Sequence, residues 1–441
     1  MLKTKHRMSQ IFVPGGFPQI TYIPRTSHQL EARVRAAADY LCKLVVVTGA
    51  TKSGKTVLVD KIFPTTSTIW INGGTISDEQ SFWDSITESL SLFTSFEESS
   101  GNDYGGSLDG EAAAEGNVLL AKGSAKVGAS VHGTVSSANT KTRNVSSKII
   151  AIKALTEQCI PLIVDDFHYI DKPIQKAIVR ALKAPIMHGL PVVFIAIPNR
   201  KYDAVEVERE MTGRIDNIEM PVWSIEELSE IAYTGFHALN VLPTNTMVHT
   251  FANAAYGSPF LMQEFCKEIC TRFEIFEECS ELFTMPDVFS AADIFSNIAE
   301  HSGRSMFEKL KRGPRARTDR KPRLLKNGNT TDIYGVVMEA FKTLQPGVQS
   351  ISYDSLRTSI RSVLSEDPPQ KHEISRVLDK IAEISYTDSS STPVIDWQSD
   401  DDVLTVTDPF FAFFSSGPDN SYQGTPTMVS LFLVSSAQSP F

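Results

Sequence analysis

Long hydrophobic runs are missing from this sequence of 441 residues. Even the apolar stretch 191–197 is bounded by His188 and Asn199, and it is far shorter than the roughly 18 residues that a membrane-spanning helix requires. The basic N-terminus leads into Val13-Pro-Gly-Gly-Phe17 and not into an uninterrupted apolar segment, so a secretory signal is not expected. The sequence therefore predicts a cytoplasmic protein with no membrane partner.

Cysteine is scarce, and its count is odd. The spacing shows no C-x-x-C pair of a zinc or redox site, and no histidine pair at metal spacing accompanies the cysteines. We expect free or buried thiols and no metal site made from protein ligands alone. The five cysteines are Cys42, Cys159, Cys266, Cys270 and Cys279.

Positive charge is in deficit overall, because the formal net charge is −10, yet it is concentrated in one segment. Residues 304–326, the basic strip, hold ten basic side chains against Glu308 and Asp319. The strip thus carries a net +8 and leaves −18 on the rest of the chain. An acidic body argues against a whole-surface nucleic-acid binder, while the strip leaves local phosphate contact open.

Short apolar, β-branched runs alternate with helical patterns over residues 1–224. This alternation predicts an α/β fold, with a parallel sheet between layers of helices. The expected strands are 43–48, 68–71, 161–164, 191–197 and 215–222, and the expected helices are 78–92, 147–158, 173–187 and 205–211.

Residues 94–146 change in character to Gly, Ser, Ala, Asn and Thr, which indicates an insertion in the α/β core. Residues 125–137 partly alternate small and β-branched side chains and are compatible with a glycine-rich hairpin, while 97–116 has a flexible composition. A mobile surface loop is the preferred interpretation. A lid, a pore or a partner-contacting hairpin is the alternative.

The remainder of the chain predicts four more segments. Residues 225–276 have helical patterns throughout and 285–303 indicate further helices, which predicts an all-helical lid at 225–303, followed by a basic linker at 304–331. In residues 332–416, three helical stretches (334–344, 353–364, 372–384) precede two strands (394–398, 403–406), which is the layout of a winged-helix domain. Residues 417–441 form a tail rich in Ser, Gly and Pro.

The segment Gly49-Ala-Thr-Lys-Ser-Gly-Lys-Thr56 matches G-x-x-x-x-G-K-[ST], with an expected strand before it and a helix after it. In such a P-loop, backbone N–H groups and the helix N-terminus face phosphates, Lys55 reaches the β- and γ-phosphates, and the Thr56 hydroxyl coordinates Mg²⁺. The sequence therefore predicts an ATP and Mg²⁺ site. The predicted loop contacts come from Gly49, Ala50, Thr51, Lys52, Ser53, Gly54, Lys55, Thr56 and Val57.

Two carboxylates follow the apolar strand at 161–164, as in a Walker B segment. Asp165 is expected to hold Mg²⁺ through water, and Asp166 to polarise the attacking water. Asp166 stands where many efficient ATPases carry glutamate. Its shorter side chain fits slow hydrolysis.

With these two motifs, residues 22–270 resemble AAA+-related P-loop ATPases, and more specifically the STAND signal-transduction ATPases. The resemblance implies a γ-phosphate sensor at Asn199 or Arg200, after the fourth strand. It also implies an adenine contact from Gly257-Ser-Pro259 in the lid, with Pro259 at the base, and a second from the Tyr22-Ile-Pro-Arg25 segment, through Arg25. A strand-end loop and an ordinary helix break are the alternatives.

The helix at 205–211 precedes the fifth strand, where AAA+ subunits offer an arginine finger to a neighbour. Arg214 and Arg209 are the candidates, because a guanidinium can neutralise developing γ-phosphate charge across a subunit interface. A plain surface arginine is the alternative. The resemblance implies a homo-oligomer.

Three functions remain, and the first is preferred: a slow regulatory ATPase that controls a separate effector protein, with defence or stress signalling as the implied setting. The alternative is a DNA-binding initiator-type AAA+ ATPase, and a small-molecule kinase is the weakest. The expected recognition helix at 372–384 mixes basic and acidic side chains, and the wing tip Asp400-Asp-Asp402 would repel phosphate. Nucleic acid binding through the strip is therefore not favoured.

Overall fold

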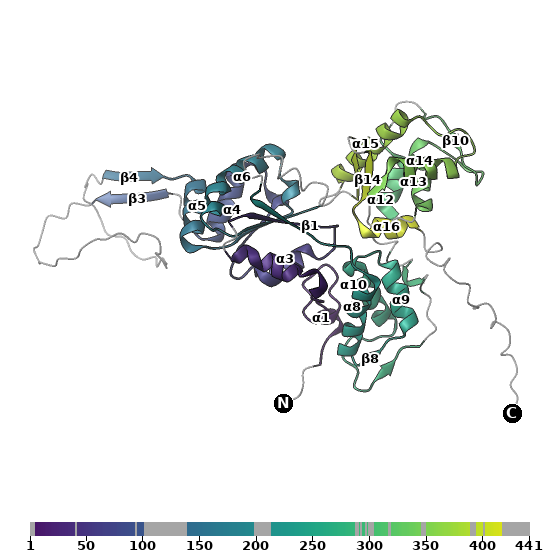
Figure 1. Cartoon of the computed structure of the whole chain (residues 1–441), viewed down its shortest axis with the longest axis horizontal. Coiled ribbons are helices and arrows are strands. Elements are labelled where there is room, and N and C mark those ends of the chain that lie inside the picture. The colour runs from purple at the N-terminus through teal and green to yellow at the C-terminus, as the bar shows by residue number, and fades with distance from the viewer. Residues whose placement is uncertain are drawn as a thin grey trace, which may run out of the picture.

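The computed structural model describes residues 5–39, 42–92, 95–100, 139–197, 213–286, 291, 293–295, 298, 304–315, 319–344, 350–388, 394–399 and 402–416. Within these residues the chain forms a parallel sheet with helices on both faces, a helical lid, and a C-terminal unit of helices and short strands (Figure 1). The α/β prediction is confirmed.

The central sheet has the strand order β2-β5-β6-β1-β7, and all neighbours are parallel. The central strands are fully buried and consist of aliphatic runs, as expected of parallel strands covered on both faces. One strand, β6, separates the P-loop strand β1 from β5, so the carboxyl ends of β1 and β5 lie at the same edge. The strands are β1 (Leu44–Thr48), β2 (Ile69–Asn72), β5 (Leu162–Asp165), β6 (Val192–Ala196) and β7 (Ile215–Glu219).

Helices cover the two faces of this sheet. Alternate residues of β1 face opposite cores: Leu44 and Val46 pack with α4, α5 and α6, whereas Val45 and Val47 pack with α2 and α3. Figure 1 shows α4, α5 and α6 on one side and α3 on the other. These helices are α2 (Leu30–Arg35), α3 (Lys55–Ile62), α4 (Glu79–Ser89), α5 (Ser147–Gln158) and α6 (Lys172–Met187).

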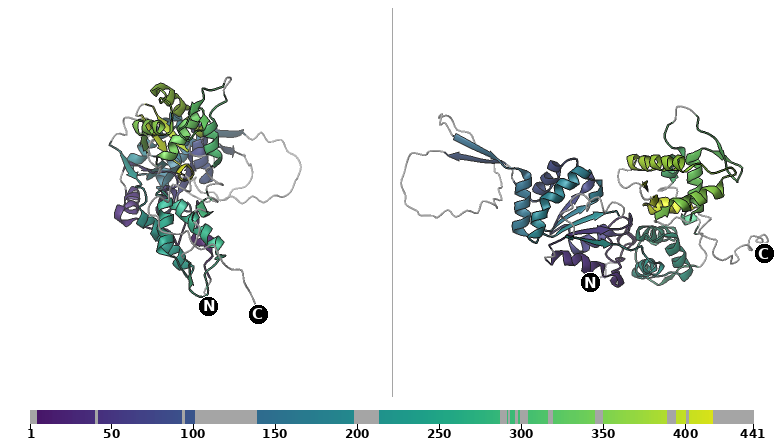
Figure 2. Two further views of the ribbon diagram at one scale, coloured as in Figure 1. Left: turned by 90° about the vertical axis from the view of Figure 1, so that its right-hand side faces the viewer. Right: turned by 45° about the horizontal axis from the view of Figure 1, so that its top comes forward.

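The insertion begins and ends in an antiparallel hairpin of β3 (Ser95–Ser100) and β4 (Asn139–Asn144). Figures 1 and 2 show this hairpin projecting away from α4 and α5. Residues 97–100, predicted to be flexible, belong to β3. The predicted hairpin at 125–137 lies outside the described residues, as does the helix expected at 205–211.

The lid is a bundle of α8 (Ile225–Ala238), α9 (Asn245–Ala254) and α10 (Pro259–Arg272), with a short parallel pair of β8 (Val241–Leu242) and β9 (Phe283–Thr284). Ser224, Thr244 and Ser258 cap the three helices through their hydroxyls. The N-terminal helix α1 (Met8–Ile11) and Phe12 pack into this lid core, which was not predicted.

The C-terminal unit contains the three helices and two ribbon strands on which the winged-helix prediction rested. A third strand, β12, completes an antiparallel sheet of order β12-β14-β13. The elements are α12 (Arg304–Arg312), β10 (Arg323–Leu324), β11 (Thr330–Thr331), α13 (Ile333–Thr343), β12 (Ser350–Ser352), α14 (Tyr353–Val363), α15 (Lys371–Asp388), β13 (Ile395–Gln398), β14 (Val403–Val406) and α16 (Pro409–Ser416).

The predicted linker at 304–331 is instead folded into this unit. Phe307 and Leu310 lie one helical turn apart on α12 and are buried in the C-terminal core. Arg323 is also buried, between the carboxylates of Glu366 at 3.5 Å and Glu373 at 3.7 Å. The high charge of the segment concealed this apolar face. Among the described residues, no helix is both long and apolar enough to cross a membrane.

Candidate nucleotide-binding site

The P-loop joins the buried end of β1 to the start of α3. Gly54 has φ 93°, a left-handed conformation that favours glycine, and it caps α3. A Cβ on Gly49 would lie 2.9 Å from the Cβ of Met220. The two glycines therefore permit a tight loop at the carboxyl ends of the strands, next to the N-terminus of α3, whose partial positive charge favours an anion.

Lys55 is buried in this loop. Its Nζ donates to the carbonyl oxygens of Gly49 at 2.9 Å and Ala50 at 2.8 Å. Burial lowers the pKa of Lys55 to about 8, although Asp165 and Asp166 oppose the shift. A phosphate in the loop would replace the two carbonyls as acceptor and supply a full negative charge.

Thr56 and Asp165 meet across the sheet edge. The Thr56 hydroxyl donates to Asp165 Oδ2 at 2.9 Å, and Asp165 Oδ1 accepts the backbone N–H of Asp166 at 2.9 Å. Burial raises the pKa of Asp165, although these hydrogen bonds and Lys55 oppose the shift. A hydroxyl and a carboxylate side by side are the oxygen ligands that Mg²⁺ takes beside a phosphate, so the residues fit that ion.

Asp166 follows Asp165 in a left-handed conformation, with φ 52°. Burial raises its pKa to about 6, and the nearby carboxylate of Asp165 adds to the shift. A carboxyl whose pKa lies near the working pH suits proton transfer.

A cavity of about 440 Å³ lies beside the P-loop, between the sheet and the lid. Its walls come from the N-terminal segment, the P-loop and α10. Both predicted base contacts, Arg25 and Pro259, line it, together with Lys52, Gly54, Lys55, Thr56 and Val57. Ala50, Thr51 and Ser53 instead line a smaller neighbouring cavity, with Gly257 and Ser258 of the lid.

Two buried P-loop hydroxyls have no hydrogen-bond partner among the described residues, as expected of a loop that binds a ligand. Within the part of the chain that the structure describes, Thr51 Oγ1 and Ser53 Oγ are buried without a hydrogen-bond partner. An unpaired buried hydroxyl costs free energy, which a bound anion or its water shell would recover. The loop thus fits a phosphate-bearing group.

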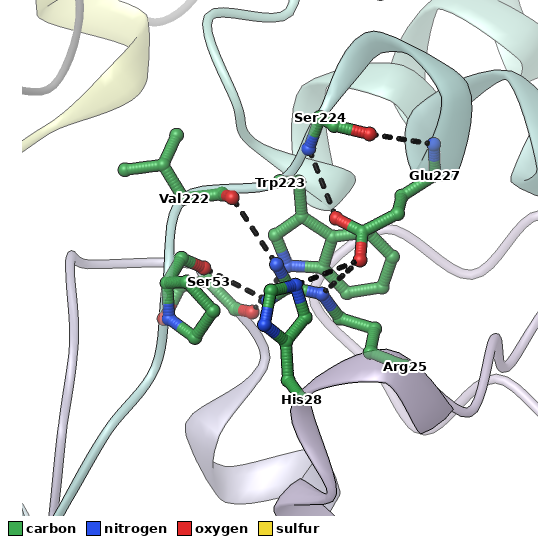
Figure 3. Close-up of polar contacts among 8 residues, drawn as sticks. Arg25, His28, Ser53, Val222, Trp223, Ser224 and Glu227 are labelled. Atoms are coloured by element: carbon green, nitrogen blue, oxygen red, sulfur yellow. Dashed lines mark hydrogen bonds and ion pairs between the residues drawn. The ribbon is translucent and has the colours of Figure 1, made fainter.

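The segment between β7 and α8 is held by the N-terminal segment and the P-loop together (Figure 3). Arg25 forms an ion pair with Glu227 at 2.9 Å, donates to the carbonyls of Pro221 and Val222, and lies over the Trp223 ring at 4.7 Å. Its side chain is only 2% exposed, so protein groups occupy the guanidinium while its stem lines the cavity.

The same cluster reaches the P-loop through Trp223, whose indole N–H donates to the Ser53 carbonyl at 2.9 Å. His28 lies 3.4 Å from Glu227, and Glu227 completes a capping box with Ser224 at the start of α8. The segment between β7 and α8, which leads into the lid, is therefore attached to the loop that would hold the phosphates (Figure 3).

Arg214 lies at the amino ends of the strands, opposite the end that carries the P-loop. Its carbonyl accepts from the N–H of Leu44, at the start of β1, whereas the P-loop follows the end of that strand. Five strand residues span about 16 Å, which is beyond the reach of the side chain. Arg214 cannot serve its own P-loop, and Asn199, Arg200 and Arg209 lie outside the described residues.

Several lining residues were not predicted, namely Trp223, Phe260 and Gln263. Gln263 Oε1 accepts the N–H of Val13 at 2.6 Å, which fixes the N-terminal segment over the cavity. The Pro and Gly residues at 14–18 indicated a turn, but no local pattern indicates which surface a turn will cover.

No family model matches the sequence, and no curated protein matches it significantly. Solved structures do resemble it: the Walker-type ATPase PABY2304 of Pyrococcus abyssi is 11% identical, over 94% of this chain and 99% of that chain, with a TM-score of 0.50. The ORC1 protein of Aeropyrum pernix in complex with DNA is 12% identical (95% and 98% covered, TM-score 0.44), and Cdc6p from Pyrobaculum aerophilum is 11% identical (92% and 96%, TM-score 0.41).

At such low identity a likeness speaks for the fold alone. The P. abyssi match covers the chain almost end to end, and with the sheet order and P-loop described above it supports an AAA+-related P-loop ATPase fold. The comparisons do not support the STAND subtype that the sequence suggested.

Proposed function

We propose that the protein binds ATP with Mg²⁺ between its sheet and its helical lid and hydrolyses it slowly, as a nucleotide-dependent switch. One observation carries the proposal: Lys55, Thr56 and Asp165 converge at the sheet edge that bounds the cavity between sheet and lid. A base in this cavity would touch α10 and the N-terminal segment while the phosphates occupy the P-loop. Binding would thus join the two units.

Each side chain has a separate task. Lys55 would turn from the loop carbonyls to the β- and γ-phosphates, and Thr56 with Asp165 would hold Mg²⁺, which neutralises charge on the phosphate oxygens. Asp166 would orient and deprotonate the attacking water. Its carboxyl is one methylene shorter than that of glutamate, which supports slow turnover.

Arg214 supports a homo-oligomer. It sits at the sheet edge remote from its own P-loop, where a neighbouring subunit could receive its guanidinium as an arginine finger. Control of a separate effector rests on the sequence resemblance alone.

Titration calorimetry with ATP in the presence and absence of Mg²⁺ tests the site. Thr56→Val removes the hydroxyl with little change of shape, so ATP should still bind but should lose most of the affinity that Mg²⁺ adds. Thr250→Val is the matched control, because the Thr250 hydroxyl bonds only within α9, to the Thr246 carbonyl at 2.8 Å. Equal Mg²⁺ dependence in wild type and Thr56→Val would refute the assignment.

A second candidate is a DNA-binding initiator-type ATPase, and one structural observation favours it. The basic strip is not a solvated linker but part of the folded C-terminal unit, so its exposed side chains Arg312, Arg315, Lys321 and Lys326 are presented from a fixed surface. One of the aligned structures is of a protein in complex with DNA.

Fluorescence anisotropy with duplex DNA separates the two candidates. Changing Arg312, Arg315, Lys321 and Lys326 to Ser should reduce affinity and flatten its salt dependence if the strip contacts phosphates. Arg320 and Arg323 are left unchanged, because ion pairs with Asp332, Glu366 and Glu373 hold them in the fold. Absence of binding at low salt would exclude the DNA candidate.

A further inference from the structure

The last described helix, α16, has two apolar faces. Phe410 and Phe413, one turn apart, belong to the lid core, whereas Phe411 and Ala412 belong to the C-terminal core. Phe410 meets Phe260 of α10 edge-on at 5.2 Å. Figure 1 shows α16 at the edge of the C-terminal unit that faces the lid helices, so it joins these two units.

The residue before this helix reaches the P-loop. Asp408 Oδ2 accepts a hydrogen bond from Lys52 Nζ at 2.8 Å, while its Oδ1 accepts from the backbone N–H groups of Phe410 at 2.8 Å and Phe411 at 3.0 Å. One carboxylate therefore starts α16 and binds the P-loop lysine.

Lys52 is held from two further sides. Its ammonium lies 4.2 Å from the ring centre of Phe410 and 5.3 Å from that of Phe260. The side chains of Lys52 and Asp408 are 28% and 17% exposed, so water screens the pair only in part. Lys52 also lines the same cavity as Lys55 and Thr56.

Nucleotide phosphates and Asp408 would compete for Lys52. Phosphates held by Lys55 and Thr56 would bring negative charge to Lys52, would attract its ammonium, and would repel the carboxylate of Asp408. Binding of nucleotide and docking of α16 would then oppose each other, and by linkage each would weaken the other by the same factor.

We propose that α16 is a strap. In the nucleotide-free protein, the Asp408 carboxylate binds Lys52 and holds α16 against the P-loop. Nucleotide phosphates release α16 because they bind Lys52 in place of Asp408. The inference rests on the proposed nucleotide site. It adds the route by which occupancy of the P-loop changes the attachment of the C-terminal unit.

Zero-length carbodiimide cross-linking of the full chain, read by peptide mass spectrometry, tests the strap directly. The Lys52–Asp408 amide should form without nucleotide, and its yield should fall about 5-fold or more with saturating ATP and Mg²⁺. The Lys371–Asp402 pair, with N and O 2.5 Å apart inside the C-terminal unit, is the internal control and should cross-link equally in both conditions.

The affinity for ATP provides a second test of the strap. Asp408→Asn and Asp408→Ser remove the charge but keep a residue that caps helices, so each should bind ATP with Mg²⁺ about 5-fold more tightly or better. Asp402→Asn, the matched control, should bind like wild type.

The outcomes separate failure of the strap from failure of the proposed nucleotide site on which it rests. If calorimetry shows ATP bound to the wild type while the Lys52–Asp408 yield stays constant, or if both Asp408 variants bind with the wild-type Kd, the strap is refuted and the nucleotide site stands. If the wild type shows no ATP binding at all, the proposed function and the strap fall together.

Discussion

The indole N–H of Trp223 donates to the backbone carbonyl of Ser53 at 2.9 Å, so the segment that begins the lid is hydrogen-bonded to the centre of the P-loop. A nucleotide that reshapes the loop must alter this contact. The lid would therefore respond to the shape of the loop through this bond, in addition to its own residues that line the cavity, such as Pro259 and Phe260.

Trp223→Phe should abolish most of the change in tryptophan fluorescence that ATP causes, and should cost about 1 kcal/mol of unfolding free energy from the lost hydrogen bond. The phenyl ring keeps apolar cover over Arg25. Trp397→Phe, in the C-terminal unit, is the control and should keep the ATP-dependent change. If both variants respond to ATP like the wild type, Trp223 does not report on the loop.

The ion pair of the buried Arg25 with the partly buried Glu227 should be a stability determinant. Burial raises the pKa of Glu227, but hydrogen bonds from Arg25 and Ser224 outweigh it and lower the pKa overall. Glu227→Gln leaves the Arg25 charge buried without its carboxylate and should cost about 3 kcal/mol in chemical denaturation.

The control is Lys148→Ala, which breaks the exposed pair with Glu79 and should cost less than about 1 kcal/mol. A comparable loss of unfolding free energy in the two variants would mean that the Arg25–Glu227 pair contributes no more to stability than an exposed ion pair.

Asp166 predicts a pH dependence of both stability and turnover. Its pKa rises from 3.8 to about 6 on folding, so the folded protein holds this proton more tightly than the unfolded chain. The unfolding free energy of the protein therefore falls as pH rises from about 4 to about 6. Asp166→Asn should raise the Tm at pH 8 and leave it unchanged near pH 3.5, whereas Asp84→Asn, exposed on α4, should shift neither.

Turnover should fall on the acid side with an apparent pKa near 6, as Asp166 becomes protonated. Asp166→Asn should retain ATP binding and lose about 10²-fold or more of the rate. A rate that is flat between pH 5 and 8 in the wild type would remove Asp166 from the role of base.

Arg214→Ala should lower turnover while leaving the Kd for ATP nearly unchanged, because the side chain is remote from its own cavity. If a neighbour uses it, wild-type activity per subunit should rise with protein concentration. Concentration-independent turnover that the substitution leaves intact would show that Arg214 is a surface residue.

The sheet, the lid helices and the P-loop were predictable because their signals are local. Aliphatic runs specify buried strands, helical patterns specify the lid helices, and the spacing from Gly49 to Thr56 is typical of a P-loop. The meeting of Thr56 with Asp165 follows, since parallel strands place their carboxyl ends at one edge.

The remaining contacts join segments that no local pattern relates. Arg25 meets Glu227 across 202 residues of sequence, and Lys52 meets Asp408 across 356. Their partners depend on how the lid and the C-terminal unit pack, which composition does not encode. The basic strip was misjudged for a related reason: its ten basic side chains obscured the apolar residues Phe307, Leu310 and Leu325, which are buried in the C-terminal core.

The Tm as a function of ATP and Mg²⁺ concentration tests whether ATP binds at the P-loop. A ligand at about 100 times its Kd stabilises the folded state by roughly 2.7 kcal/mol, so the wild-type Tm should climb steadily with ATP. Lys55→Ala should lose this shift, while Lys153→Ala, which alters an exposed lysine on α5, should keep it. A wild-type Tm that ignores ATP, or a Lys55→Ala protein that responds as strongly as the wild type, would contradict the account.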